Sequence, residues 1–196
     1  GRCVIVHEGA RRAGFGAGPA RRGIRRIKPA LVLTAFTLVI LIPAFHEISL
    51  RQIMGPETHA HDGVVAVEEA IKMTLQGRNP YTEHYYGTPI EKTAFADSQA
   101  WQRLGMEKYP ALEKFVYLPM TFLLPLPLYV FTTKVAGGFD LRLLLIPLYL
   151  FFIWFAYRIS DEDRKVIAIE FAALNPFLAT FLITGRNDIM PLALMA

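Results

Sequence analysis

The chain has 196 residues, of which 53% are hydrophobic and 19% charged, with a net charge of +4. Soluble domains carry about a quarter of charged residues, and the apolar surplus here collects in runs with few or no charges. This pattern excludes a disordered chain and a simple soluble globule, and the single Cys3 excludes an internal disulfide framework. The chain begins with Gly and stops inside an apolar run, so we expect an N-terminal piece of a larger protein.

The first 28 residues form a basic segment that precedes an apolar one. Eight of the 21 Lys and Arg residues lie in residues 1–28, where we predict a disordered tail. Lys and Arg next to a first membrane helix hold that end in the cytoplasm. Few aromatic residues accompany these charges, so nucleic acid is not an expected partner. The uncharged residues 29–45 predict transmembrane helix 1; their length and the lack of an A-x-A site argue against a cleaved signal peptide.

Residues 46–114 form a long polar segment, which we predict to be an extracytoplasmic loop. Within it, residues 63–76 have helical periodicity and predict an amphipathic helix that lies on the membrane surface. Asp62 stands at the expected N-cap, and Glu68 and Lys72 have the spacing of an ion pair on the polar face.

Further apolar runs predict an all-α, multi-pass transmembrane bundle. Helix 2 is expected at 115–133, helix 3 at 143–159, helix 4 at 166–184 and the start of a truncated helix 5 at 189–196. Simple alternation then places residues 134–142 and 185–188 inside and residues 158–165 outside. We expect an integral membrane protein, in a bacterial plasma membrane rather than the endoplasmic reticulum.

Asp62 is the candidate catalytic residue, because a carboxylate just beyond a membrane helix can take a proton from an acceptor hydroxyl. Its alternative role is only that of an N-cap. His59 and His61 flank it and are weak candidates for a divalent metal; solvated loop histidines are the default, and no cofactor is expected otherwise.

The turn after the amphipathic helix reads GRNPY, residues 77–81. Arg78 is a candidate phosphate partner, Asn79 belongs to the same motif, and Tyr81 and Tyr85 are candidate platforms for a sugar. The same residues are also typical of a turn after a helix and of loops at membrane interfaces.

The order of these features resembles the multi-span glycosyltransferases of the GT-C fold, which use polyprenyl-phosphate sugar donors. The resemblance is carried by Asp62 early in the outer loop, GRNPY, YLP at 117–119, Asn175-Pro176 and GRND at 185–188. It implies that Asp62 is a base or substrate organiser and that Arg or Lys residues hold the donor phosphate. It adds Tyr117, Arg186 and Asp188 to the substrate-binding candidates.

The sequence departs from that family in three ways. The remaining membrane spans and the C-terminal part, which complete the donor site in relatives, are absent from it. A single Asp stands where some members have a paired acidic motif, which weakens a metal site. Alternation also puts Arg186 and Asp188 on the side away from Asp62, so either a short or re-entrant span changes the count or those residues are structural.

The resemblance implies a bilayer, a polyprenyl-phosphate-linked sugar and a glycan or protein acceptor as partners. The first alternative is a transporter or flippase subunit, which needs polar residues at mid-membrane depth in several spans. The second is a membrane scaffold whose large loop docks a partner.

Overall fold

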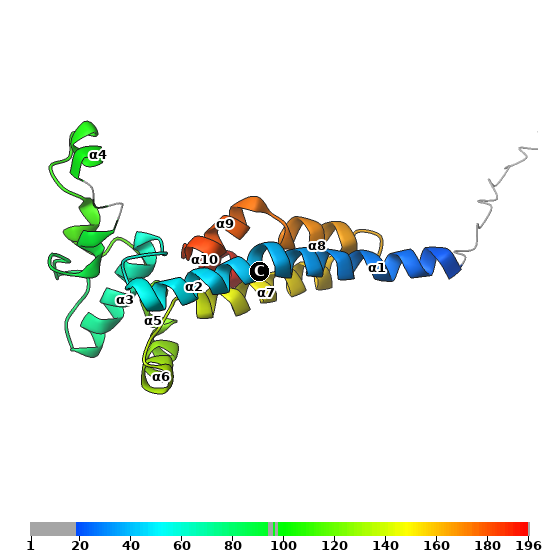
Figure 1. Cartoon of the computed structure of the whole chain (residues 1–196), viewed down its shortest axis with the longest axis horizontal. Coiled ribbons are helices and arrows are strands. Elements are labelled where there is room, and N and C mark those ends of the chain that lie inside the picture. Colours follow the sequence, from blue (N-terminus) through cyan, green and yellow to red (C-terminus); the bar gives the residue numbers. More distant parts are fainter. Residues whose placement is uncertain (1–18, 94–95, 97, 196) are drawn as a thin grey trace, which may run out of the picture.

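The computed structural model describes residues 19–93, 96 and 98–195, and this part of the chain is helical without strands (Figure 1). The prediction of an all-α fold is therefore confirmed for the described residues. Two helices, Lys28–Met54 and Arg142–Ile159, are long and apolar enough to cross a membrane, and a bent helix pair would make a third.

The first long helix is α1 (Pro19–Phe36), a π-helical turn η1 (Thr37–Leu41) and α2 (Ile42–Met54). The Ile42 N–H donates to Thr37 O, five residues back. This widening directly precedes Pro43, which has no N–H to donate and clashes with a normal helical turn.

The bounds of this helix correct the predicted ones. Helix 1 was expected at 29–45, with a disordered tail before it and a loop after it, but the helix starts at Pro19 and continues to Met54. Residues 1–18 of the tail lie outside the described part. The apolar stretch of 27 residues spans about 40 Å, which exceeds the thickness of about 30 Å of a membrane core.

Helix α3 (Asp62–Leu75) lies at the centre of the polar head, which comprises α3 and the short helices that follow it up to Leu112. It is therefore not a helix on the membrane surface. Eleven of its residues are buried, including Glu68 and Glu69. Each buried glutamate of this helix has a cationic partner. Arg51 of α2 contacts Glu68, and Lys72 of α3 itself contacts Glu69. The prediction of a Glu68–Lys72 surface pair was therefore wrong.

Short helices complete the head: η2 (Pro89–Lys92), α4 (Ser98–Arg103) and η4 (Pro110–Leu112). Fully buried Tyr85 joins them, since its N–H donates to Leu112 O at 2.8 Å. Figure 1 shows this head at one end of an elongated molecule.

The segment predicted as helix 2, residues 115–133, does not form one span. Residues 115–119 are not helical, and the rest divides into α5 (Met120–Leu123) and α6 (Leu126–Ala136). Pro119, Pro125 and Pro127 explain the breaks, because each lacks the N–H of a regular helix. Helix α6 projects sideways from the junction between the head and the long helices (Figure 1).

The remaining helices are α7 (Arg142–Ile159), α8 (Lys165–Ala173), α9 (Pro176–Thr184) and α10 (Ile189–Met195). Helices α8 and α9 meet at a bend of 42° where helix 4 was expected to run unbroken through 166–184. Pro176 cannot donate to Ala172 O, and the Tyr149 hydroxyl donates to that carbonyl instead, at 2.8 Å. Asn175 Oδ1 accepts from the N–H of Phe177 at 3.0 Å and so caps α9.

Because the α5–α6 segment does not cross to the other end of the molecule, each later connection lies at the end opposite to the one that simple alternation predicted. Phe139 O accepts from Gln52 and Thr184 O accepts from the His61 N–H, so residues 134–142 and 185–188 lie at the head end. Tyr157 and Lys165 share a cavity with Lys28 at the other end. The predicted sides of all three connections were therefore wrong relative to the head.

Candidate functional site

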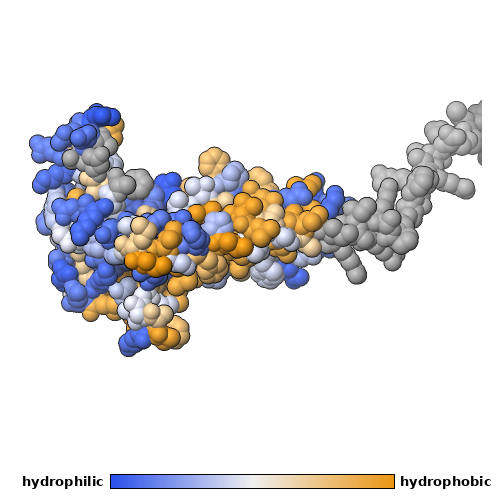
Figure 2. Space-filling view, in the orientation of Figure 1, coloured by the Kyte–Doolittle hydropathy of each residue, from blue (hydrophilic) through white to orange (hydrophobic). Residues whose placement is uncertain are grey.

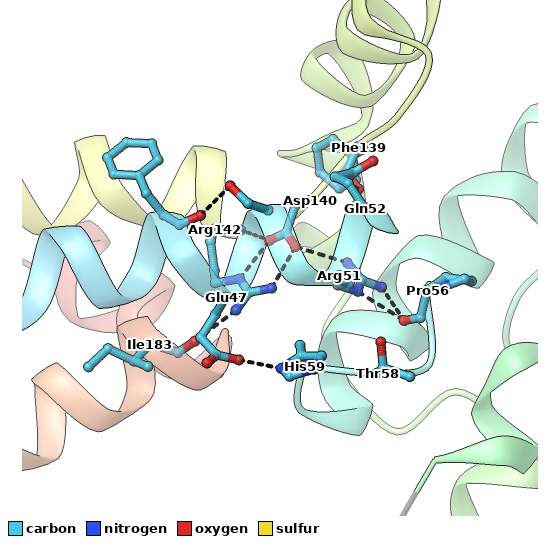
Figure 3. Close-up of polar contacts among 12 residues, drawn as sticks. Glu47, Arg51, Gln52, Pro56, Thr58, His59, Phe139, Asp140, Arg142 and Ile183 are labelled. Atoms are coloured by element: carbon cyan, nitrogen blue, oxygen red, sulfur yellow. Dashed lines mark hydrogen bonds and ion pairs between the residues drawn. The ribbon is translucent and has the colours of Figure 1, made fainter. Parts of the chain in front are cut away.

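A buried network of charged side chains lies where the head meets the long helices (Figure 3). Arg51 Nη1 and Nη2 donate to the two carboxylate oxygens of Glu68 at 2.6 and 2.8 Å. Nη1 also lies 3.2 Å from Asp140 Oδ2, and Nε and Nη2 donate to Pro56 O at 2.9 and 2.7 Å. Every side of the guanidinium thus has an acceptor, which is what burial of an arginine requires.

Arg142 extends this network toward α9. Its Nε and Nη2 donate to the two oxygens of Asp140 at 2.9 and 2.7 Å, while Nη1 donates to Ile183 O at 2.8 Å. Both charged side chains have an exposed fraction of 0%. Glu68, Arg51, Asp140 and Arg142 alternate in sign, so the network has no net charge when all four are ionised.

The two carboxyl groups of this network titrate in opposite directions. Burial raises the pKa of Glu68 to about 7, with the contacts to Arg51 offsetting only part of that effect. Asp140 is also buried, yet hydrogen bonds from Arg142 and the charges of both arginines hold its pKa below the usual value. Asp140 is therefore the permanent anion, and Glu68 changes protonation near neutral pH.

The network fixes the end of α9 against the start of α3. Ile183, which is bound by Arg142, precedes Thr184, whose carbonyl accepts from the His61 N–H at 2.8 Å. Gly185 follows with φ of +81°, and a Cβ there would lie 2.6 Å from a methyl of Val64. Only glycine permits this close approach.

Asp62 is the first residue of α3, and His61 is its N-cap. The prediction that Asp62 itself is the N-cap was off by one residue. The Gly63 N–H donates to His61 Nδ1 at 3.1 Å and to Asp62 Oδ1 at 2.8 Å. The hydrogen bond from Gly63 holds the Asp62 carboxyl group in one orientation, with 9% of its side chain exposed.

Three other predicted residues lie near Asp62. The Tyr117 hydroxyl would lie 2.9 Å from a Cβ on Gly63. Burial, followed by the charges of Asp62 and Asp188, raises the pKa of Tyr117 to about 12, and Arg186 lowers it. The His61 N–H to Thr184 O hydrogen bond brings residues 185–188 to the start of α3, so Asp62, Tyr117, Arg186 and Asp188 form one cluster. The predicted separation of Arg186 and Asp188 from Asp62 was therefore wrong.

Arg186 keeps donors free within this cluster. Its Nε is buried and makes no hydrogen bond within the described part of the chain, and Asp188 Oδ2 lies 3.5 Å from it. The guanidinium carbon lies 5.0 Å from the centre of the Phe181 ring, within the range of a cation–π contact. An exposed fraction of 43% leaves the side chain accessible to an anion.

The GRNPY residues divide between separate places. Arg78 is exposed at the end of α3 opposite to Asp62, about 20 Å along the helix, and contacts Gln76 and Glu83. Asn79 Oδ1 accepts from the Tyr81 N–H at 3.0 Å, as in a turn. The Tyr81 hydroxyl donates to Tyr117 O at 2.8 Å, so Tyr81 supports the cluster.

Tyr85 is a core residue and not a platform for a sugar. Its ring is fully buried and its hydroxyl donates to Pro80 O at 3.2 Å.

The two histidines do not form one metal site. His59 has a left-handed backbone with φ of +51°, and its Nδ1 lies 2.9 Å from Glu47 Oε2, whereas His61 contacts Asp62. Among the described residues, no group of three His, Cys, Asp or Glu side chains could hold a metal ion. Glu47, His59, His61 and Thr184 instead line a groove of about 430 Å³.

Sequence reasoning missed the buried network. It assigned Glu68 to a solvated face and Asp140 and Arg142 to a surface turn. The sequence did contain one signal of this network, the pair Asp140 and Arg142 directly before an apolar run. A carboxylate at this spacing can accept from the arginine N–H at the start of a helix, as Asp140 does here.

No protein-family model matches this chain, and no characterised protein or solved structure matches it.

Proposed function

We propose that this protein is a membrane glycosyltransferase that moves a sugar from a polyprenyl-phosphate donor to a glycan or protein acceptor. The observation that carries the proposal is the cluster of Asp62 with Tyr117, Arg186 and Asp188 at the end of the apolar helices. A base and a phosphate-binding cation at that level can meet a lipid phosphate and a water-soluble acceptor together.

The proposed reaction needs one base and one anion site. The acceptor oxygen attacks the anomeric carbon, its proton passes to Asp62, and the bond from that carbon to the phosphate oxygen breaks. Polyprenyl phosphate leaves with the electron pair, and the exposed part of the Arg186 guanidinium stabilises the phosphate. Asp188, beside Arg186, orients that guanidinium.

An apolar groove next to Arg186 suits the isoprenoid chain of such a donor. The groove has a volume of about 410 Å³ and runs between α7, α8, α9 and α10. Phe181 lines it and also contacts the Arg186 guanidinium. A lipid that places its phosphate at Arg186 can therefore place its chain against phenylalanine rings: Phe152, Phe171, Phe177 and Phe181.

The charge distribution supports an extracytoplasmic head in a bacterial plasma membrane. Arg158, Arg164 and Lys165 lie at the end of the molecule that also holds Lys28. Lys and Arg gather on the cytoplasmic side of membrane proteins. The proposed orientation thus places the N-terminus inside and Asp62 outside.

A transporter would need ionisable groups at mid-membrane depth. In α7, the charged residues Arg142 and Arg158 lie only at the two ends, and the buried network lies at the head. This distribution favours transfer at the membrane boundary over passage through it.

The test compares wild type, Asp62→Asn and Asp161→Asn, all reconstituted in lipid with a panel of radiolabelled polyprenyl-phosphate sugars. Asparagine at 62 keeps the shape and the oxygen that accepts from Gly63, and it removes the base. We expect Asp62→Asn to lose transfer by about 10²- to 10⁴-fold. Asp161, exposed at the opposite end, is the matched control and should keep full transfer.

Wild-type turnover in a folded Asp62→Asn variant would remove Asp62 from the mechanism. Solute flux without any glycosyl product, together with no donor binding, would favour the transporter.

A further inference from the structure

Helix α6 is an apolar helix that packs against the rest of the protein on one side only, through Leu126, Leu128 and Tyr129. None of its residues is buried. Phe131 and Val135 have exposed fractions of 62% and 71%, and its one charged residue is Lys134, near its C-terminal end. Figure 2 shows apolar surface on this projecting helix as well as along the long helices.

Both ends of the α5–α6 segment are held at the head, so the segment returns to the side on which it begins. At its start, Phe122 is buried and its ring centre lies 5.4 Å from that of Phe115. At its end, Phe139 O accepts from Gln52 at 3.3 Å and Asp140 contacts Arg51. The 11 residues of α6 reach about 16 Å, about half of a membrane core of about 30 Å.

The contacts of α6 fix its position relative to the two candidate spans. Tyr129 and Thr133 of α6 share a cavity with Arg51 and Gln52, near the end of the first candidate span. Gly138 and Phe139 line the same cavity and lie just before Arg142, where the second candidate span begins. Helix α6 is therefore attached at the level where both apolar helices meet the polar head.

We propose that α6 lies in the interfacial layer of the bilayer on the head side and is covered by lipid. An uncovered apolar helix at that level gains free energy from acyl chains and places Lys134 among lipid phosphates. The occupant is lipid rather than protein because the two spans set the membrane boundary at this height.

The test places an NBD fluorophore on a single cysteine in a Cys3→Ser background. Labels at Phe131→Cys and Val135→Cys report on α6, Gln102→Cys on the exposed face of α4, and Leu150→Cys on the middle of α7. The full chain is reconstituted in phosphatidylcholine–phosphatidylglycerol vesicles that contain lipids with a doxyl quencher at carbon 5 or carbon 12. Soluble iodide reports on exposure to water.

We expect carbon-5 doxyl lipids to reduce the fluorescence at 131 and 135 at least twofold and more strongly than carbon-12 lipids. The label at 150 should show the opposite order, and only the label at 102 should respond fully to iodide. Iodide quenching at 131 equal to that at 102 would overturn the proposal. Shielding from lipid and iodide alike would also overturn it, because a second copy or another protein then covers α6.

Discussion

Arg51 is the residue on which the junction between head and long helices depends most directly. It contacts Glu68, Asp140 and Pro56 with an exposed fraction of 2%. Arg51→Met keeps the apolar stem and removes all of these hydrogen bonds. Glu68 then remains buried beside Asp140 without its cation.

The expected cost follows from the burial of an unpaired charge. Removal of one partner from a buried ion pair costs about 3–5 kcal/mol. For a chain of this size each kcal/mol shifts Tm by about 2–4 °C, so Tm should fall by about 10 °C. The loss should be larger at pH 8 than at pH 5, because Glu68 without Arg51 escapes its penalty only by taking up a proton.

The measurement is thermal unfolding in dodecyl maltoside, with tryptophan fluorescence as the readout. The double variant Arg51→Met/Glu68→Met removes both charges and should cost much less than the sum of the single variants. Exposed Arg103→Met is the matched control and should change stability by less than about 0.5 kcal/mol. An Arg51→Met protein as stable as wild type at pH 8 would refute the buried network.

Three further predictions use the same protein. Between pH 4.5 and about 7 the folded state keeps a proton on Glu68 that the unfolded state has lost, so the free energy of unfolding should fall by about 3 kcal/mol as pH rises through this window. Glu68→Gln should flatten the dependence of Tm on pH, and an unchanged slope would contradict the raised pKa. Gly185→Ala should lower the free energy of unfolding by about 2–4 kcal/mol, because its Cβ would lie 2.6 Å from a methyl of Val64 in α3. The control Gly137→Ala has a similar φ and open space around it, so it should lower the free energy of unfolding by only about 1 kcal/mol in the same denaturation experiments. In a Cys3→Ser background, an impermeant maleimide should label Lys134→Cys from the head side and Asp161→Cys from the other; labelling from one common side would disprove the topology.

Much of the architecture could be predicted from local patterns. The apolar run after the basic tail, the run that starts near Arg142, and the amphipathic periodicity of residues 63–76 all correspond to helices. These features depend on neighbouring residues, so the sequence alone reveals them. Residues 115–133 were predicted as one span despite prolines at 119, 125 and 127, and the topology of that segment depended on where its two ends are attached.

The site shows the same division. Asp62 was identified from its place at a helix start, and the structure shifts the cap by one residue. Its neighbours Tyr117, Arg186 and Asp188 were chosen from a family resemblance, and alternation then placed two of them on the wrong side. The Asp140–Arg51 contact and the His61–Thr184 hydrogen bond bring the distant segments back to the head.

The sequence by itself determined that the chain is helical, has long apolar helices and carries its positive charge next to the first of them, because period and composition are local properties. The tertiary structure alone decided that α3 is buried, that α5–α6 returns to the head and that four separate charged residues neutralise one another. The physical reason is that a buried charge is stable only beside an opposite charge. The residue that supplies it can be far away in the chain, as Arg51 and Asp140 are.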